Sequence, residues 1–400
     1  NYIQREAMQY VSKATGMDIT IRRVDLRFPL DLLLRDVLVV DKSDTLLTLE
    51  HLNIRVQALP LLKKKVKLDE LTLRKAHINT SNRIEGVRVI GDVKEVKVGA
   101  REIDIDTSFA DLDNLLVDNG DFYIQLTDTT TQEKDTLDTP SDWRILLGKV
   151  KVNESTIHLD MPLTEQVLLA TIPDLNVSRV EVDLKNEDYR VHKLDLAKGE
   201  LSYRSGVGDS IKGLDINNLQ FSELSLTGDS ISYSPHQIKA NISSFRMQEQ
   251  SGLVVDKLQG RFLKDDTMLL GSDFLLETPQ SRLAFDFSLP MDWCDNSKEN
   301  HLKGEVHLSL QELATILGVH DDRFDYSDWG PITCNVSVGG SSQQMEIQDV
   351  YIELANSFIM TAAGAIQNVC SDQRSGQLDI LGDLYDLSCF NSWLSEDNSI

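Results

Sequence analysis

The chain has 400 residues, of which 41% are hydrophobic and 26% are charged, so it is long enough for two or three domains or for one extended repeat body. This composition is typical of a folded protein and excludes an intrinsically disordered chain. The formal net charge of −24 excludes the phosphate backbone of a nucleic acid as the main partner.

The first predicted element is an amphipathic helix over residues 1–15 that ends at Gly16. Its apolar residues recur at the spacing of one helix face: Ile3, Ala7, Met8, Tyr10, Val11 and Ala14. We expect this segment, residues 1–16, to cap the open end of a sheet. No run in the sequence approaches the roughly 20 apolar residues of a membrane-spanning helix. Because the chain begins abruptly at Asn1, we expect a membrane anchor upstream of it.

The stretch from Leu46 to Thr80 predicts two strands joined by a corner at Pro60, which has no main-chain N–H to donate to a sheet. Apolar and polar residues alternate with a period of two, as in a strand with one buried face. The alternation slips at Asp69-Glu70 and at Arg74-Lys75, as it does at a β-bulge or a bend. The apolar positions are Leu52, Ile54, Val56, Ala58, Val66, Leu68, Leu71, Leu73, Ala76 and Ile78.

The corner carries the lysines of a mildly basic N-terminal quarter. The first 100 residues contain 18 Lys and Arg against 13 Asp and Glu, whereas the other 300 contain 22 against 51. A basic end is suited to anionic lipid headgroups. Lys63, Lys64 and Lys65 are therefore candidate headgroup contacts, although a solvated turn is the favoured interpretation.

Alternating segments continue to the end of the chain, about 20 or more in all, at the spacing expected of all-β proteins. Residues 127–141 are almost all polar and predict a surface loop or a disordered insertion. Near the C-terminus, the strand-like residues 304–310 lead into helix-like residues 311–317. The strand-like residues 376–382 lead in the same way into residues 383–394.

The predicted fold is all-β and mainly antiparallel, an elongated, curved, groove-shaped sheet of repeated strands. A short N-terminal helix and a few short helices near the C-terminus complete it. We expect a first groove segment at residues 17–126, a middle segment at 142–303, and strand-helix repeats at 304–400.

No motif indicates catalysis, so we expect no enzyme, no cofactor and no metal site. GxSxG, HExxH and P-loop motifs are absent, and Gly206-Val207-Gly208 lacks the helix of a dinucleotide site. His301, His307 and Cys294 do not have the spacing of a standard metal site. The acidic stretch from Asp321 to Asp328 differs from a calcium-binding EF-hand.

Cysteine usage leaves the redox compartment open. Cys294, Cys334, Cys370 and Cys389 allow three disulfide connectivities in principle. Cys334 occupies an apolar position in an alternating run, which favours a buried free thiol.

Four consecutive patterns follow the predicted N-terminal helix: I-x-x-V-D-L, L-x-D-V-x-V-x-D, L-x-x-L-x-I and L-x-x-x-V-x-L-x-x-L-x-L-x-x-A-x-I. Their positions are Ile21, Val24, Asp25, Leu26, Leu34, Asp36, Val37, Val39, Asp41, Leu49, Leu52, Ile54, Leu62, Val66, Leu68, Leu71, Leu73, Ala76 and Ile78. In this order they resemble the N-terminal region of the TamB family, within the AsmA-like superfamily. Beyond residue 80 the likeness lies in the strand texture and in the segment LQELATILG. We expect the counterparts of the family's N-terminal anchor and C-terminal domain to lie outside residues 1–400.

The resemblance implies a non-enzymatic protein of the periplasm, anchored in the inner membrane of a diderm bacterium. It implies that the protein carries phospholipid between the two membranes along a hydrophobic β-groove and supports outer-membrane assembly. The implied partners are phospholipid acyl chains, the inner membrane and an outer-membrane barrel-assembly protein.

We expect one groove lined by Leu52, Ile54, Val56, Val66, Leu68, Leu71, Leu73, Val180, Val182, Leu184, Leu283, Phe285 and Phe287. The alternative is an extracytoplasmic β-rich scaffold, adhesion protein or outer-membrane protein assembly factor with a closed hydrophobic core. The alternation itself fits both interpretations, because the core of any β-sandwich produces the same pattern.

Overall fold

The structure is a computed structural model that describes residues 17–27, 31–41, 44–56, 68–80, 86–104, 107–127, 142–206, 211–295, 297–319, 330–355 and 357–386. Nineteen strands contain most of these residues, and the described helices are the 3-10 helix η1 (Pro162–Thr164) and the α-helix α3 (Leu310–Leu317). The predicted all-β, mainly antiparallel fold is confirmed. The helix expected over residues 1–16 and most of the polar segment 127–141 lie outside the described residues.

The chain divides into two compact units. The first contains Asn1–Gly208 and Asn217–Leu224, and the second contains Asp209–Ile216 and Ser225–Ile400. The boundaries expected at residues 126, 142 and 303 stay a prediction, because this division into two does not test them.

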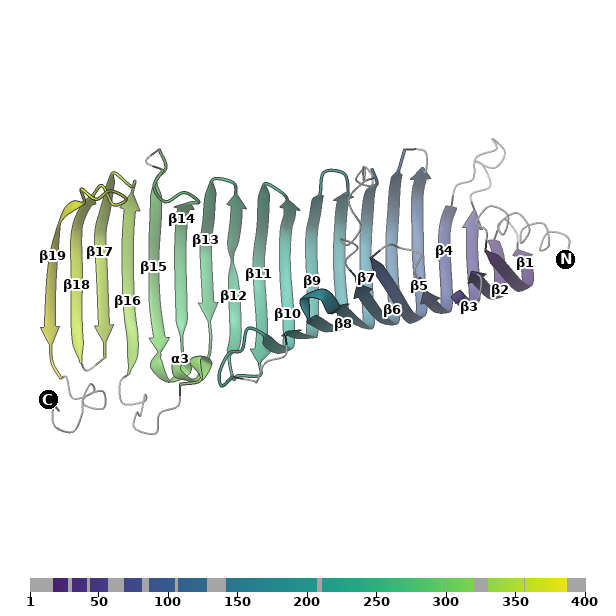
Figure 1. Cartoon of the computed structure of the whole chain (residues 1–400), viewed down its shortest axis with the longest axis horizontal. Coiled ribbons are helices and arrows are strands. Elements are labelled where there is room, and N and C mark those ends of the chain that lie inside the picture. The colour runs from purple at the N-terminus through teal and green to yellow at the C-terminus, as the bar shows by residue number, and fades with distance from the viewer. Residues whose placement is uncertain are drawn as a thin grey trace. The chain divides into compact units, whose positions relative to one another are not determined.

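In the first unit, each strand pairs with the next one along the chain (Figure 1). The strands are β1 (Asp18–Arg27), β2 (Asp31–Asp41), β3 (Asp44–Val56), β4 (Leu68–Asn79), β5 (Val87–Asp104), β6 (Phe109–Leu126), β7 (Arg144–Met161), β8 (Gln166–Asp183) and β9 (Asp188–Ser205). Strand β10 (Asn218–Ser234) begins in this unit and continues in the second.

One pair in the first unit is parallel. Phe109 of β6 pairs with Arg144 of β7, and Gln125 pairs with Asp160 in the same direction. Parallel neighbours cannot be joined by a tight hairpin, because the chain has to return to the starting end before the second strand begins. In the sequence, the polar residues 127–141 stand between these two strands.

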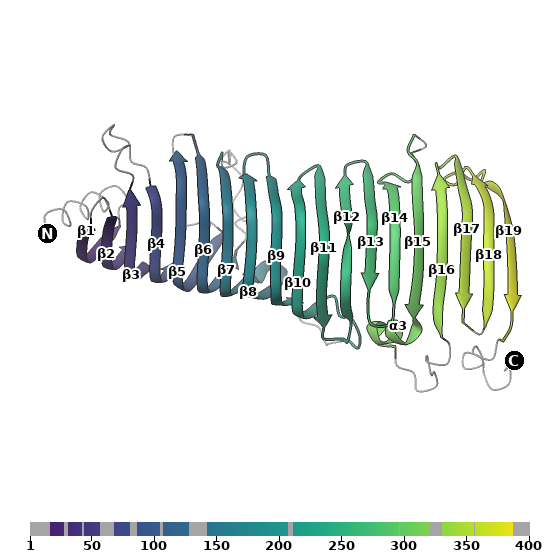
Figure 2. The same ribbon diagram turned by 180° about the vertical axis from the view of Figure 1, so that it is seen from behind.

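In the second unit the consecutive strands from β11 to β19 are all antiparallel (Figure 2). They are β11 (Gln237–Glu249), β12 (Val254–Asp265), β13 (Met268–Glu277), β14 (Arg282–Pro290), β15 (Asn300–Ser309), β16 (Pro331–Gly340), β17 (Gln344–Leu354), β18 (Phe358–Gln367) and β19 (Ser375–Leu384).

Helix α3 confirms the first of the two predicted strand-to-helix transitions. The Ser309 hydroxyl caps it by accepting a hydrogen bond from the N–H of Glu312. The helix ends at Gly318, whose φ of 66° suits a residue without a side chain. The carboxylate of Glu312 accepts hydrogen bonds from the hydroxyls of Thr278 and Ser281, which fastens the helix to the turn between β13 and β14.

The second predicted transition is wrong at its start. Asp383 and Leu384 belong to strand β19, where they pair with Ile359 and Phe358 of β18. Cross-strand pairing, which is a long-range contact, decides the conformation of these two residues against their helix-like spacing. The rest of that prediction, residues 387–394, lies outside the described residues.

Candidate functional site

The first unit places apolar side chains on one face of its sheet, in rows that cross all nine strands β1–β9. The first row consists of Val24, Leu34, Leu52, Leu73, Val96, Val117, Val152, Leu175 and Leu196. The second consists of Leu26, Leu32, Ile54, Leu71, Val98, Leu115, Val150, Val177 and Leu194. Apart from the exposed Leu26 on strand β1, these side chains are half-buried. With strands about 4.8 Å apart, each row is about 38 Å long.

The opposite face of the same strands is polar. One of its rows consists of Arg23, Arg35, His51, Arg74, Glu95, Asp118, Asn153, Asp174 and Ala197. Cross-strand ion pairs run over it: Arg74 Nε lies 2.9 Å from Glu95 Oε1, and Lys94 Nζ lies 2.7 Å from Asp118 Oδ2. The Lys94 hydrogen bond lowers the pKa of Asp118 and raises that of Lys94. These cations are exposed, so the pairs contribute little stability, and the face is a solvated surface.

A line of bends crosses all nine strands of the first unit, and the register between neighbouring strands is the same on both sides of it. Along this line, two consecutive residues of each strand, rather than one, separate two positions of the apolar face. The pairs are Arg22-Arg23, Arg35-Asp36, Glu50-His51, Arg74-Lys75, Lys94-Glu95, Asp118-Asn119, Asn153-Glu154, Pro173-Asp174 and Ala197-Lys198. In five of these pairs the second residue has a φ between 42° and 53°: Asp36, Lys75, Asn119, Glu154 and Lys198.

The bends have a direction. Both residues of each pair lie on the polar side, so each strand bends towards its apolar side. The slip predicted at Arg74-Lys75 is one of these bends and is confirmed by the φ of 50° at Lys75. The slip predicted at Asp69-Glu70 is also confirmed, because Arg55 pairs with Glu70 while Val56 pairs with Leu68.

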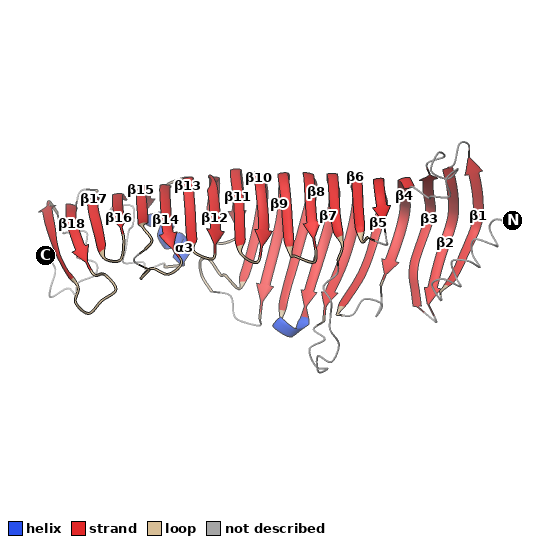
Figure 3. Ribbon diagram, turned by 90° about the horizontal axis from the view of Figure 1, so that it is seen from above, coloured by secondary structure: helices blue, strands red, loops and turns tan. Residues whose placement is uncertain are grey.

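The most buried apolar residues of β1–β5 lie next to this line of bends. They are Ile21, Val37, Leu49, Ala76 and Val93, each between 2% and 7% exposed, and they form one cross-strand row. A bend towards the apolar side brings the side chains on its inner side together, which accounts for this burial. Figure 3 shows the long strands β5–β9 bending along their length. We call the apolar face of β1–β9, with this bend, the apolar trough.

Ser155 of β7 carries the only described hydroxyl in this bend that is almost fully buried, at 1% exposure. Its Oγ accepts a hydrogen bond from the N–H of Gly120 at 3.1 Å and donates one to the carbonyl of Asn153 at 2.7 Å. The side chain therefore pairs main-chain groups that the bends of β6 and β7 leave outside the regular ladder.

The second unit has its own apolar face. One row consists of Phe245, Leu258, Leu276, Leu283, Val306, Cys334, Ile352 and Met360, and a second consists of Ala240, Phe262, Gly271, Phe287, Leu302, Val338, Ile347, Gly364 and Leu378. Cys334 is a half-buried free thiol whose pKa is raised by burial. The apolar position predicted for it is therefore correct.

Phenylalanine rings on both apolar faces lie over glycines of the neighbouring strands. A Cβ added at Gly91 would meet the ring of Phe122, and one added at Gly271 would meet the ring of Phe287. Each ring covers main chain that would otherwise be bare, as in aromatic pairing with strand glycines. The rings thus lie flat against the sheet and project little above it.

A recess of about 460 Å³ opens over β10–β14 in the second unit. Its lining includes Ala240, Phe262, Gly271 and Phe287 of the second row, together with the chain neighbours of the first three. Its volume is within the range of pockets that hold small ligands.

The predicted lining residues fall into three groups. Leu52, Ile54, Leu71 and Leu73 lie in the two rows of the apolar trough, and Val180 and Val182 lie on the same face near the ends of β8. Leu283, Phe285 and Phe287 lie on the apolar face of the second unit. Leu184 lies in the turn after β8, where its N–H donates to the carbonyl of Trp143.

The other predicted residues are not placed. Val66 and the candidate headgroup contacts Lys63, Lys64 and Lys65 lie outside the described residues, and so do the side chains of Val56 and Leu68. The single groove that was expected to contain all of these residues therefore stays a prediction.

The described residues contain no group of three or more His, Cys, Asp or Glu that could hold a metal ion. Cys294 forms a disulfide with Cys370, so it is not available as a partner for His301 and His307. The acidic stretch around Asp321 lies outside the described residues. None of the described helices is long and apolar enough to cross a membrane.

The chain matches no family model, and it is not significantly similar to any curated protein or any solved structure. The TamB resemblance of residues 1–80 therefore stays a prediction.

Proposed function

We propose that this chain is a non-enzymatic lipid carrier whose apolar sheet faces hold acyl chains, and that it carries phospholipid between the two membranes of a diderm bacterium. One observation carries the proposal. Half-buried apolar rows cross the strands of each unit, and all described strands belong to one sheet, so neither unit has a second sheet among its described residues.

An apolar sheet face normally packs against a second layer about 10 Å away. An uncovered apolar face is unfavourable in water and is typical of surfaces that bind apolar ligands. Helices η1 and α3, with three and eight residues, are too short to cover these rows. An acyl chain on the face would take the place of a second layer, which the described residues do not provide.

The energetics suit a carrier. Each methylene group that leaves water for the apolar face contributes about 0.8 kcal/mol, which is close to what it gains in a bilayer. Exchange of a lipid between bilayer and protein is therefore nearly balanced. A row of about 38 Å is more than twice the depth of one leaflet, which is about 15 Å. Because the attraction has no direction, a chain can move along the row without breaking specific contacts.

The proposed location is the periplasm, with attachment to the inner membrane through an upstream anchor and delivery at an outer-membrane barrel-assembly protein. The Cys294–Cys370 disulfide supports an oxidising compartment outside the cytoplasm. The anchor and the barrel partner rest on the TamB resemblance alone.

The first test is to purify the protein without detergent and to extract it with organic solvent. Mass spectrometry of the extract should detect phospholipid in a defined ratio to protein. Protein that is free of lipid after purification, and that takes up no fluorescent phospholipid from vesicles, would contradict the proposal.

The second test places a charge in the apolar trough. Ile54 lies between Leu32 and Leu71 in the second row, so Ile54→Asp puts a carboxylate among apolar side chains. An unpaired charge there costs several kcal/mol when an acyl chain covers it, so lipid uptake should fall. Asn53→Asp places the same charge on the polar face of the same strand and is the matched control.

Circular dichroism distinguishes the two interpretations of the apolar face. If the face is open to lipid, Ile54→Asp should keep its β-sheet spectrum and lose uptake, and Phe285→Asp should do the same in the second unit. An Ile54→Asp variant that unfolds would favour the closed-core scaffold. A folded variant with normal uptake would remove this row from the proposed path.

A further inference from the structure

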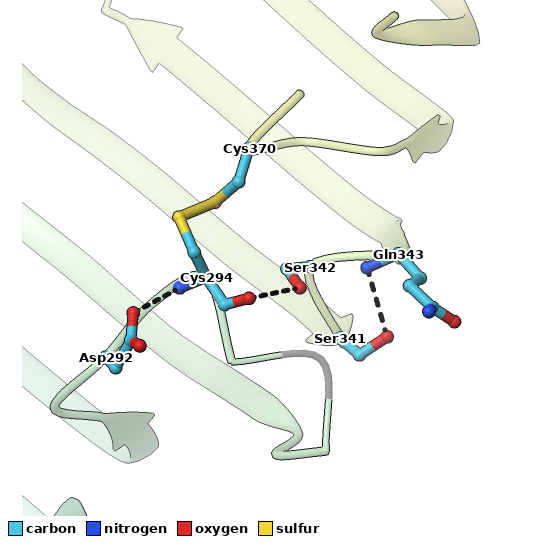
Figure 4. Close-up of a disulfide and its surroundings, with 6 residues drawn as sticks. All are labelled: Asp292, Cys294, Ser341, Ser342, Gln343 and Cys370. Atoms are coloured by element: carbon cyan, nitrogen blue, oxygen red, sulfur yellow. Dashed lines mark hydrogen bonds between the residues drawn. A yellow bond between two sulfur atoms is a disulfide. The ribbon is translucent and has the colours of Figure 1, made fainter. Parts of the chain in front are cut away.

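One rim of the second unit carries a disulfide between two turns that are far apart in the sequence. Cys294 follows β14, Cys370 follows β18, and 76 positions separate them. Strands β16 and β17 and their connecting turn, residues 341–343, lie between the two cysteine-bearing turns. Figure 4 shows the disulfide beside this middle turn.

The disulfide requires the two outer turns to lean towards each other. In a flat sheet, the turn after β14 and the turn after β18 are about four strand spacings, or about 19 Å, apart. The Cα atoms of Cys294 and Cys370 are 5.7 Å apart. The turn after β14 and the turn after β18 therefore lean over the middle turn and meet at the disulfide.

Hydrogen bonds connect the middle turn to both of its neighbours. The Ser342 hydroxyl donates to the carbonyl of Cys294 at 3.1 Å. The carbonyl of Ser342 accepts from the N–H of Val369, and the carbonyl of Gln343 accepts from the N–H of Asn368, both at 2.9 Å. The three turns are thus joined by one covalent bond and three hydrogen bonds.

The disulfide is exposed, whereas the residues near it are buried. Cys294 and Cys370 are both solvent-exposed, so a small thiol or a protein thiol can reach the bond. Ser342, Asn300 and Met345, which lie in this rim, are between 3% and 5% exposed. Exposed disulfides exchange with thiols more readily than buried structural ones.

We propose that Cys294–Cys370 is a thiol–disulfide exchange site, whose oxidation locks the three turns of this rim and whose reduction by a dithiol releases them. A thiolate of the dithiol attacks one sulfur, the Cys294–Cys370 bond breaks, and a mixed disulfide forms. The second thiol of the dithiol then displaces the protein sulfur. Two electrons and two protons pass to the protein, which ends with two thiols, while the dithiol ends as a disulfide.

The test uses the full chain, equilibrated in buffers with increasing ratios of reduced to oxidised dithiothreitol and then alkylated with N-ethylmaleimide. Mass spectrometry should find Cys294 and Cys370 blocked in the oxidised protein and labelled together once the disulfide is reduced. Cys334, which is half-buried with a raised pKa, is the internal control and should stay unlabelled in the folded protein.

Hydrogen exchange then measures which main-chain amides the disulfide protects. On reduction, the amides of residues 291–295, 341–345 and 368–374 should lose protection, and those of β5–β8 should keep theirs. The double variant Cys294→Ser/Cys370→Ser should give the same pattern without any dithiol. If that variant does not fold, reduction of the wild-type protein decides alone.

Two results would overturn the proposal. The first is alkylation of Cys294 and Cys370 in protein that was never exposed to a reductant. The second is unchanged protection of the three turns after complete reduction. Ser342→Ala, which leaves the disulfide intact, should loosen residues 341–343 alone.

Discussion

The pairing of Gly271 with the ring of Phe287 gives a prediction about stability. Gly271→Ala should destabilise the protein when the Phe287 ring is present and stabilise it when the ring is absent. Gly271 lies on β13, directly opposite Phe287 of β14, and a Cβ added there would overlap the ring. No main-chain atom lies in that overlap. In Gly271→Ala the ring must therefore move off the sheet.

The expected size follows from two opposing effects. Removing a fully buried phenylalanine side chain costs about 3–5 kcal/mol, so displacing the half-buried Phe287 ring costs about 2 kcal/mol at most. Gly271 does not have a positive φ, so alanine there also restricts the unfolded chain, which gains about 0.4–1 kcal/mol. Gly271→Ala should therefore destabilise the second unit by about 1 kcal/mol. In a Phe287→Ala background only the gain remains, and Gly271→Ala should stabilise by about 0.4–1 kcal/mol.

The assay is urea unfolding followed by circular dichroism, with hydrogen exchange of β13 and β14 to assign the transition to the second unit. Gly382→Ala on β19 is the control, because the nearest atom to its added Cβ is the carbonyl oxygen of Ile359 at 3.6 Å. It should be neutral or slightly stabilising in both backgrounds. If Gly271→Ala destabilises equally with and without the Phe287 ring, the ring does not lie over the glycine and the reasoning is refuted.

The remaining predictions concern the bend, the polar face and the disulfide. Ser155→Ala leaves the buried N–H of Gly120 without its partner and should cost about 1–3 kcal/mol in urea unfolding, whereas no change would mean that another group pairs it. Asp118→Asn should lower stability at neutral pH. The pKa of Asp118 is lowered in the folded protein, so its contribution is complete above the ordinary value of 3.8 and is lost as the pH falls through the lowered value. The variant and the wild type should therefore converge in acid, and a difference that persists there would contradict the Lys94 pairing. Reduction of the disulfide, which closes a loop of 76 residues, should remove about 4.5 kcal/mol of stability from the second unit by the chain-entropy estimate, and an unchanged urea midpoint would contradict it.

Local patterns in the sequence were sufficient to predict the class of fold. Alternation at Leu52 and Ile54 depends only on the two-residue period of a strand, and the structure has these residues in β3. The slip at Arg74-Lys75 was visible for the same reason, because a bend with two consecutive residues on one side interrupts the period where it occurs. The helix at Leu310–Leu317 was predictable from its cap and its glycine stop, which are neighbours in sequence.

The other strands of the first unit contain the same interruption of the two-residue period. A polar doublet between two positions of the apolar face, such as Arg35-Asp36 or Asp118-Asn119, is present in each strand from β1 to β9, with Ala197-Lys198 as the least polar example along the line. Comparing the strands for this doublet would have predicted the line of bends. It would not have predicted that the doublets align, because alignment depends on the register between strands.

The sequence by itself determined which residues alternate, where the period slips and which ends carry caps, because each of these depends on neighbours along the chain. The tertiary structure alone decided which strands pair, that β6 and β7 run parallel, which glycine lies under which phenylalanine, and which two cysteines join. These contacts bring together residues separated by tens of positions. A local pattern carries no information about such a partner, so Asp383 and Leu384 were expected in a helix and are held in a strand by β18.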